Sequence, residues 1–364
     1  MLRPQSPPII ILACAMPPPI FGQSVVNAAV RDAVMARTSG VVIADISAGQ
    51  IDKNINYHAK RLTRVIQAAW EIIKYRNSPR RKIYMVTQVG YGIFYNHLLL
   101  SLARLLDYKI VLHHHDSGHT KFHRTQVAFL MWLIGSGAVH VTLGPGMAED
   151  LKRYKQVQRV IVSQNARIIP DPNVARPPRD KASPLVIGHM SNLSRAKSLN
   201  LAIDTITEAR SRGLDVRLIL AGPCDGAEAE VTVKEAQDKL GDALDYRGPV
   251  GGETKDRFFR DIDIFLFPTI YKYEAQPLVI LEAMSYSAAV IVAERGYTAE
   301  LVDTSGDVYP GDADFAVKAA TRLGELLANP DDLHAAQSAA RARYVMLRRI
   351  ATEQFDQLID VLVT

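Results

Sequence analysis

The chain has 364 residues, enough for two domains of roughly 150–200 residues each. Hydrophobic residues make up 48% and charged residues 22%, which excludes a mainly disordered or fibrous protein. The charge divides unevenly: residues 1–180 hold 23 Lys and Arg against 10 Asp and Glu (+13), whereas residues 181–364 hold 20 against 28 (−8). The two halves are therefore expected to meet different partners, and nucleic acid, an anionic lipid or an anionic acceptor would suit the basic first half.

Two features of the chain bear on where it works. Cys14 and Cys224 are the only cysteines and lie in no CxxC pattern, which excludes a disulfide framework or zinc ribbon and suits a cytoplasmic location. The apolar run near the start reads as a secretory signal or as a buried first strand, and its brevity favours the strand. The apolar stretch from Val127 to Ile134 is shorter than the about 18 residues that cross a bilayer, so an integral membrane protein is not expected.

In the first half, β-rich runs alternate with helical stretches such as Tyr57–Arg76, in which apolar residues recur at helical spacing. The expected strands are Ile9–Cys14, Val41–Ser47, Lys82–Gln88, Lys109–His114, Ala138–Leu143 and Arg159–Val162. The Pro-rich, charged segment Asp171–Pro184 is typical of a linker.

The second half repeats the alternation and ends in a helical region from Asp314 to about Val363. The expected strands here are Leu185–His189, Val216–Gly222, Leu244–Tyr246, Asp263–Pro268 and Val290–Ala293; the expected helices are Leu199–Gly213, Thr254–Asp261 and Pro277–Ser285. Both halves therefore predict an α/β fold of two doubly wound, Rossmann-like domains facing a cleft.

The segment Asp263–Met284 carries the most specific pattern. A buried strand ends at Pro268, a polar loop holds Glu274, and Glu282 follows eight positions later inside a helix that opens near Pro277. Glu274 thus lies where a helix N-terminus offers free N–H groups to an anion. The alternative is one solvated and one capping glutamate.

With its flanks DIFLFPT and AVIVAERGYTAELV, this Glu-x7-Glu pattern resembles the retaining GT-B glycosyltransferases of family 4, the glycosyl transferases group 1. The resemblance implies that Glu274 binds the donor sugar and Glu282 the ribose hydroxyls of the nucleotide. Where the family often has Gly-Phe-Gly, this chain has Ala275-Gln276-Pro277 followed by Leu278. The turn is expected to line the donor site, and its altered sequence leaves the sugar open.

The segment VIGHMSNLSRAKSLNLAIDT is similar to the family's phosphate-binding turn. The resemblance assigns Lys197 to the leaving diphosphate, a role that suits a cation; a solvated surface lysine is the alternative. Ser198 stands where the family has Gly, and Ser191 where many members have Arg. Arg195 is either a substitute for that Arg or a solvated side chain.

Two further turns are expected at the donor. Gly248, Pro249 and Val250 resemble the wall against the nucleotide base, or else form a simple turn. Gly22 resembles the glycine whose backbone approaches the diphosphate and the acceptor. No GxGxxG fingerprint occurs, which argues against a nicotinamide enzyme.

A histidine-rich segment, KIVLHHHDSGHTKFHR, follows the expected fourth strand. By the resemblance His115 faces the donor sugar. The spacing of His115, His119 and His123 beside Asp116 also raises a metal site, but the expected strand and loop disfavour it, so we predict no metal. His113 and His115 should lie on one side of the strand, with His114 on the other in a structural role.

Basic residues cluster in the first half at Lys60, Arg61, Arg64, Lys74, Arg76, Arg80, Arg81 and Lys82. They indicate a solvated helix face or peripheral docking to an anionic membrane that carries a lipid-linked acceptor. Nucleic-acid binding is disfavoured, because no aromatic stacking platform accompanies them.

The resemblance implies an acceptor-binding domain over residues 1–175, a nucleotide-sugar domain over 183–345, and a helix over about 346–364 that crosses back. It implies metal-independent transfer of a hexose from a UDP- or GDP-sugar, without another cofactor, to a saccharide or lipid-linked acceptor in cell-surface polysaccharide synthesis. The alternatives are a sugar-nucleotide epimerase of the same fold and a non-catalytic nucleotide-sugar-binding subunit.

Overall fold

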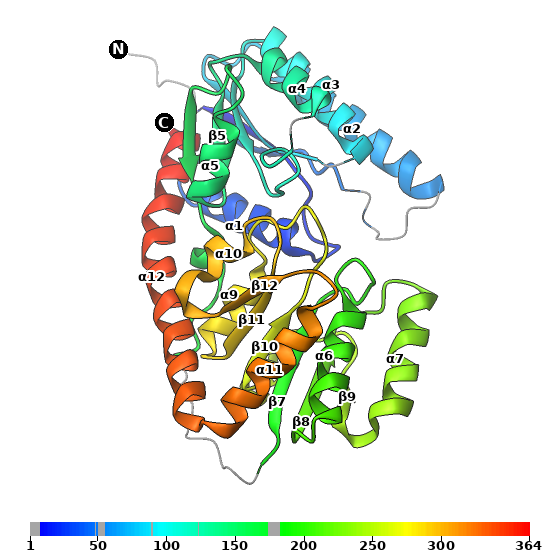
Figure 1. Ribbon diagram of the computed structural model, residues 1–364. Coiled ribbons are helices and arrows are strands. Elements are labelled where there is room, and N and C mark those ends of the chain that lie inside the picture. The colour runs from blue at the N-terminus through cyan, green and yellow to red at the C-terminus, as the bar shows by residue number, and fades with distance from the viewer. Residues whose placement is uncertain (1–7, 48, 50–54, 89, 123, 174–182) are drawn as a thin grey trace. The chain divides into compact units, whose positions relative to one another are not determined.

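The chain forms two compact units, which Figure 1 shows in a computed structural model. The first unit comprises Met1–Ile168 and Ile350–Thr364, and the second Ile169–Arg349. The structure describes residues 8–47, 49, 55–88, 90–122, 124–173 and 183–364. The sequence predicted the domain boundaries at residue 175 and at about residue 346. Most of the expected linker, Asp171–Pro184, lies outside the described residues.

The first unit is built on a parallel sheet with the strand order β2-β1-β3-β4-β5-β6. Its strands are β1 (Ile9–Ala13), β2 (Val41–Ile43), β3 (Arg81–Val86), β4 (Lys109–His113), β5 (Val139–Thr142) and β6 (Arg159–Val162). Every predicted strand of this half is present. The edge strand β2 is shorter than predicted and ends at Ile43, although the Ala44 and Ile46 N–H groups still donate hydrogen bonds to the Leu12 and Cys14 carbonyls.

Helices cover both faces of the first sheet. They are α1 (Gly22–Met35), α2 (Ile55–Lys74), α3 (Ile93–Leu105), α4 (Thr125–Ile134), α5 (Pro145–Leu151) and the end of α12 (Pro330–Val363), with 3-10 turns at Gly90–Gly92 and Asn165–Ile168. Because alternate residues of a strand point to opposite faces, Ile11 packs in the core under α2, α3 and α4, and Leu12 packs in the core under α1 and α12.

Lys82 corrects part of the predicted basic cluster. Its side chain is buried, and Nζ donates a hydrogen bond of 2.6 Å to the Val361 carbonyl near the end of α12. Burial lowers the pKa of Lys82 to about 8. This lysine caps a helix C-terminus, where carbonyls lack partners, and belongs to the fold rather than to a basic surface.

The second unit repeats the architecture with a parallel sheet in the order β12-β11-β10-β7-β8-β9. Its strands are β7 (Leu185–Met190), β8 (Val216–Ala221), β9 (Leu244–Tyr246), β10 (Ile264–Phe267), β11 (Ala289–Glu294) and β12 (Asp307–Pro310). The sequence missed β12, an edge strand that is only partly buried and carries no continuous apolar run.

The helices of the second unit are α6 (Leu199–Ser211), α7 (Ala227–Leu240), α8 (Glu253–Asp261), α9 (Leu278–Ser285), α10 (Thr298–Val302), α11 (Phe315–Ala328) and the start of α12, with 3-10 turns at Gly241–Ala243 and Asp303–Ser305. The predicted last helical region is two helices, because the extended backbone of Asn329 ends α11. Among the described residues, no helix combines the length and the apolar character that crossing a bilayer requires.

Candidate functional site

The predicted donor residues of the second unit gather at the carboxyl edge of its sheet. Lys197 lies in the turn between β7 and α6, and Glu274 lies in the loop between β10 and α9. Strands β7 and β10 are hydrogen-bonded neighbours, so residues 77 positions apart in sequence emerge side by side. This edge is where ligands bind in parallel α/β sheets.

Lys197 and Glu274 form an ion pair, with Lys197 Nζ donating to Glu274 Oε1. The Glu274 side chain is buried, and Thr269 Oγ1 lies 3.4 Å from the same carboxylate oxygen. The Lys197 ammonium also lies 4.6 Å from the centre of the Tyr271 ring. The two groups that the resemblance assigned to sugar and diphosphate therefore lie in direct contact.

Ser198 explains how this turn tolerates the loss of its glycine. Its φ is +60°, in the left-handed region that favours glycine. Ser198 Oγ accepts a hydrogen bond of 3.0 Å from the Ile270 N–H, at the start of the loop that leads to Glu274. The serine thus ties the Lys197 turn to the Glu274 loop, which glycine has no side chain to do.

Gly296, which the sequence did not single out, fixes the other side of Glu274. Its φ is +56°, and a Cβ at this position would collide with the Glu274 carbonyl oxygen. The turn after β11 can therefore approach the backbone of Glu274 only because residue 296 is glycine. The sequence signal was the glycine in AERGY, within a flank that resembled the family.

Glu282 is held by a lysine that the sequence did not predict. Lys255 Nζ, from α8, lies 2.5 Å from Glu282 Oε1. Glu282 Oε2 is buried and, among the described residues, has no hydrogen-bond partner. One carboxylate oxygen is thus anchored, and the other can accept hydrogen bonds from a ligand.

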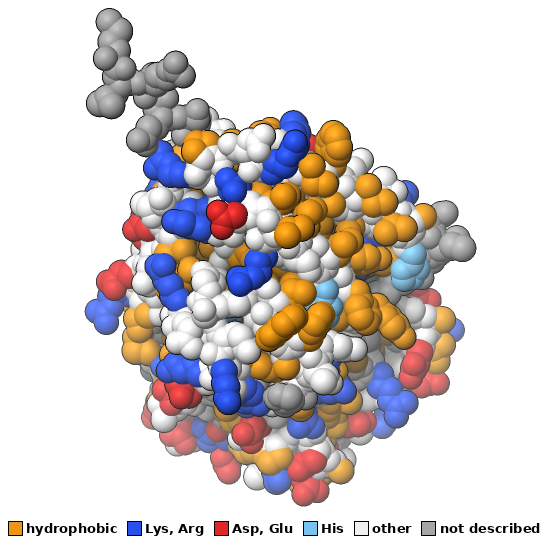
Figure 2. Space-filling model, turned by 90° about the horizontal axis from the view of Figure 1, so that it is seen from above, with side chains coloured by type: hydrophobic (Ala, Val, Ile, Leu, Met, Phe, Trp, Pro, Cys, Tyr) orange, Lys and Arg blue, Asp and Glu red, His pale blue; other side chains and the backbone are white. Residues whose placement is uncertain are grey.

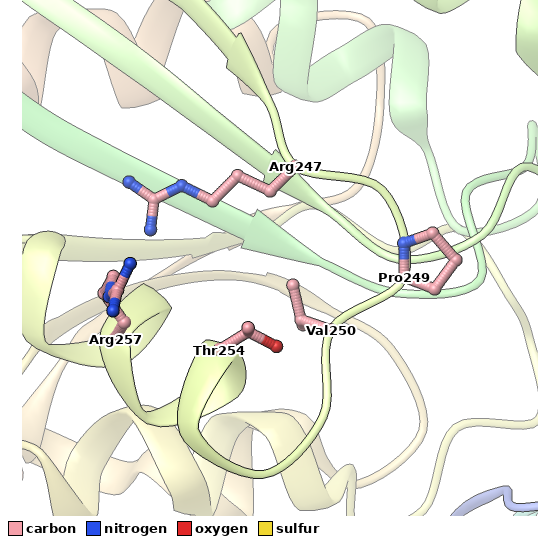
Figure 3. Close-up of a pocket in the computed structure, with 5 residues that line it drawn as sticks. All are labelled: Arg247, Pro249, Val250, Thr254 and Arg257. Atoms are coloured by element: carbon pink, nitrogen blue, oxygen red, sulfur yellow. The ribbon is translucent and has the colours of Figure 1, made fainter.

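A pocket of about 350 Å³ opens beside the predicted base wall (Figure 3). It is lined by Arg247, Pro249, Val250, Thr254 and Arg257. Arg247 is paired with Asp245 at 2.9 Å and Asp261 at 2.7 Å, which positions its guanidinium. Gly248 joins this wall to the strand ends, because its carbonyl accepts a hydrogen bond of 2.7 Å from Gly222 N.

The other predicted donor residues have more varied surroundings. Ser191 Oγ is hydrogen-bonded to His189 Nε2 at 3.1 Å, and Arg195 is exposed. Ala275 is buried, and Gln276 is partly buried. Pro277, predicted inside the first turn of its helix, is extended and precedes α9, which begins at Leu278.

Two predicted residues belong to the first unit. Gly22 is exposed at the start of α1. His115 lies two residues beyond the end of β4 and is partly exposed. Its ring centre lies 4.0 Å from that of His113, which agrees with the prediction that both face one side. The surrounding protein lowers the pKa of His115 to about 3 by excluding water, so its imidazole is neutral at pH 7.

His114 takes the predicted structural position. Its Nε2 lies 3.1 Å from Nδ1 of His140 on β5, and both rings are fully buried. His113 is buried as well and is hydrogen-bonded to the Tyr84 hydroxyl at 2.7 Å. Burial lowers the pKa of His140 to about 4 and holds those of His113 and His114 well below their usual value.

A metal reading finds no support within the described part of the chain. There, no group of three or more His, Cys, Asp or Glu side chains is arranged to hold a metal ion. His123, the third residue of the proposed spacing, lies outside the described residues.

The comparisons with known proteins concern both the family and the fold. Residues 184–329, which span nearly the whole second unit, match the family model of glycosyl transferases group 1. The second unit carries a group 1 glycosyltransferase domain. For the second unit, this confirms the group 1 glycosyltransferase resemblance that the Glu274 and Lys197 segments carried. No curated protein sequence matches the chain.

Solved structures share the fold of this chain over almost its full length. HepE from Anabaena, in complex with UDP, has a TM-score of 0.68 at 16% identity, covering 96% of this chain and 100% of that one. Sucrose-phosphate synthase from Thermosynechococcus elongatus has a TM-score of 0.71 at 16% identity, covering 98% and 99%. A glycosyltransferase from Rickettsia africae has a TM-score of 0.70 at 14% identity, covering 98% of each chain. Two parallel six-stranded sheets and these likenesses confirm the predicted GT-B fold.

Proposed function

We propose that this glycosyltransferase moves a hexose from a UDP- or GDP-sugar to a saccharide or lipid-linked acceptor, with retention of the anomeric configuration. The observation that carries the proposal is the contact between Lys197 and Glu274 at the carboxyl edge of the family-matched unit. A cation and a carboxylate side by side suit a donor that presents a diphosphate next to sugar hydroxyls. The UDP in HepE, a structure of the same fold, supports a nucleotide donor.

Each site residue has a part in this proposal. When the donor binds, the diphosphate replaces Glu274 as the partner of Lys197, which neutralises its charge. The Glu274 carboxylate is then able to accept hydrogen bonds from the sugar hydroxyls. Glu282 Oε2 accepts the ribose hydroxyls while Lys255 holds Oε1. The wall at Gly248, Pro249 and Val250 borders the base, beside Arg247. His115, neutral at pH 7, orients the sugar by hydrogen bonding rather than by charge.

The proposed reaction breaks the bond between the anomeric carbon and a diphosphate oxygen. The bond to the acceptor oxygen forms on the same face, and the acceptor proton leaves with the diphosphate. Lys197 stabilises the charge that develops on the leaving group, which is the largest contribution expected of a preorganised cation. The chemistry asks for no metal, so the proposal is metal-independent and without a further cofactor.

The remaining parts rest on the family resemblance and the charge of the chain. The acceptor belongs to cell-surface polysaccharide synthesis, and the protein works in the cytoplasm or at the cytoplasmic face of a membrane. The basic first half, at +13, supports an anionic surface or acceptor as its partner.

A thermal-shift panel of UDP-, GDP- and ADP-sugars tests the donor. A ligand at a hundred times its Kd stabilises the folded state by about 2.7 kcal/mol, which raises the Tm by several degrees. The binding donor is then incubated with and without acceptors, and the products are resolved by mass and by NMR of the anomeric proton. Conversion of the nucleotide sugar in the absence of any acceptor would identify an epimerase. Donor binding with neither transfer nor slow donor hydrolysis would identify a non-catalytic subunit. Unchanged turnover in Glu274→Ala, His115→Ala and Glu282→Ala alike would contradict the assignment.

A further inference from the structure

The first unit exposes a row of large apolar side chains along three neighbouring helices. Leu62, Ile66 and Trp70 follow one another at intervals of four on α2, which keeps them on one side of the helix. The same spacing places Phe94 and Leu98 together on α3. We define the apolar face as eight residues with exposed fractions of 49–82%: Leu62, Ile66, Trp70, Phe94, Leu98, Leu105, Phe129 and Trp132.

Helices α3 and α4 are joined by aromatic contacts, and α2 meets α3 where the Arg61 guanidinium lies 5.2 Å from the centre of the Tyr95 ring. The His97 ring, on α3, lies 5.9 Å from Phe94 and 5.3 Å from Phe129 of α4, measured between ring centres. Phe129 stacks on Trp132 at 5.6 Å. Figure 2 shows hydrophobic side chains gathered over this side of the molecule, with Lys and Arg side chains beside them.

Packing of the core does not account for the apolar face. On α2 the core is served by Val65, Ala68 and Ile72, which point to the sheet and are fully buried. Leu62, Ile66 and Trp70 lie on another side of the same helix. On α4 no residue is charged, although Thr125, Gln126, Phe129 and Trp132 are exposed. Soluble proteins rarely leave so many large apolar groups together in water without a partner for them.

The charge around the apolar face is strongly positive. From Ile55 to Ile134 the chain holds 12 Lys and Arg against 3 Asp and Glu, a balance of +9. Lys74 is exposed on α2, one turn beyond Trp70 of the apolar row, and Arg76 and Arg80 are exposed just beyond the helix, whereas Lys60 and Arg64 are exposed on another side of α2. Lys74 and the exposed Arg104, which precedes Leu105, therefore set positive charge at the edge of the apolar face.

We propose that the apolar face docks the protein on an anionic lipid bilayer. Tryptophan, phenylalanine and leucine enter the boundary between headgroups and acyl chains, while flanking lysine and arginine contact anionic headgroups. A second copy of the chain fits less well, because two copies of so basic a segment repel one another. The inference deepens the proposed function, on which it rests for the idea of a lipid-linked acceptor, since docking would hold the enzyme at the surface where such an acceptor lies.

Intrinsic fluorescence gives a direct test, because the chain has only two tryptophans and both, Trp70 and Trp132, belong to the apolar face. The full chain is titrated with vesicles of phosphatidylcholine alone and with phosphatidylglycerol added. Tryptophan emission should move to shorter wavelength with the anionic vesicles, and the protein should sediment with them. An unmoved spectrum together with protein left in the supernatant would overturn the proposal.

Two pairs of variants separate the apolar from the electrostatic contribution. Leu98→Asp should weaken partition at least tenfold, whereas Val231→Asp, at an equally exposed position on α7, should leave it unchanged; each side chain is 54% exposed. Lys74→Gln with Arg76→Gln should weaken binding to anionic vesicles about thirtyfold, against no change for Lys234→Gln with Lys239→Gln on α7. Equal partition of Leu98→Asp and the parent onto vesicles would contradict the proposal. So would a parent protein that is dimeric without vesicles and becomes monomeric on Leu98→Asp substitution.

The result is kept apart from the proposed function by assaying donor hydrolysis and transfer to a water-soluble acceptor. Leu98→Asp, checked for folding by circular dichroism, should retain both activities. Vesicle binding without either activity would refute the transferase and leave the docking surface standing. Activity without vesicle binding would refute the docking surface and leave the transferase standing.

Discussion

The two units share one architecture and differ in how they treat polar groups at the strand ends. In the second unit the groups are charged and paired: Lys197 with Glu274 and Lys255 with Glu282. In the first unit the corresponding end of β4 holds the neutral histidines His113 and His114, both buried. Charged pairs can exchange partners with an anionic ligand, whereas buried neutral rings mainly fill space. The fold is thus common to both units, and the chemistry is specific to each.

The ion pair at the second sheet should dominate turnover. Glu274→Gln removes the charge that holds Lys197 and should lower kcat by about a hundredfold or more, as loss of one preorganised electrostatic group does. Glu235→Gln, an exposed position on α7, is the matched control. Steady-state kinetics with the donor found by thermal shift measures both, and a loss below threefold would mean that the pair is structural.

The close approach at Gly296 should matter nearly as much. Gly296→Ala forces the Glu274 backbone away and should lower kcat/KM by about thirtyfold, with strain at a positive φ adding a loss of stability. Gly241→Ala carries the same strain at φ +53° but meets open space, so it should lose stability alone. Kinetics and Tm on both variants separate the two effects, and similar kcat/KM values for the pair would disprove the positioning role.

The Lys255–Glu282 pair should act on donor binding rather than on the chemical step. Lys255→Met frees Glu282 from its anchor and should weaken donor binding about tenfold with little change in kcat. Calorimetric titration with the donor gives the Kd, with Lys234→Met as the control on an exposed helix. A drop in kcat at unchanged Kd would place the pair in the reaction instead.

The buried histidines of the first unit should make it sensitive to acid. The pKa of His140 is lowered to about 4, so above that value the folded state holds it neutral, while the unfolded state protonates it near pH 6.5. The unfolded state therefore binds more protons, and stability falls as the pH drops from about 6.5 to about 4. When the pH is lowered from 7.5 to 6, the free energy of unfolding of His140→Gln should fall by about 1 kcal/mol less than that of the parent.

Denaturant titrations at the two pH values measure this difference, and hydrogen exchange assigns it to the first unit. His334→Gln, an exposed position on α12, should keep the pH dependence of the parent. An identical pH dependence in His140→Gln and the parent would show that His140 is not held neutral.

Sequence reasoning succeeded where one local signal was enough. Buried strands such as β10 show as continuous apolar runs, and the glutamate spacing with its flanks identified the family before any fold was known. It failed for β12, whose exposed edge has no such run, and for Lys82, whose partner on α12 is 279 residues away. Lys255 and Gly296 were not predicted for the same reason, because their roles depend on contacts between loops and helices that are separate in sequence.

The path of the chain sets the order in which the units can be completed during synthesis. The core on one side of the first sheet includes Phe355, Leu358, Ile359 and Leu362 from the end of α12, which the ribosome makes only after the whole second unit. Until then the strands Ile9–Ala13 and Arg81–Val86 lack part of the apolar cover on that side. The nascent first unit therefore keeps part of this apolar surface exposed until the second unit has been synthesised. The first unit starts first along the chain but is completed last.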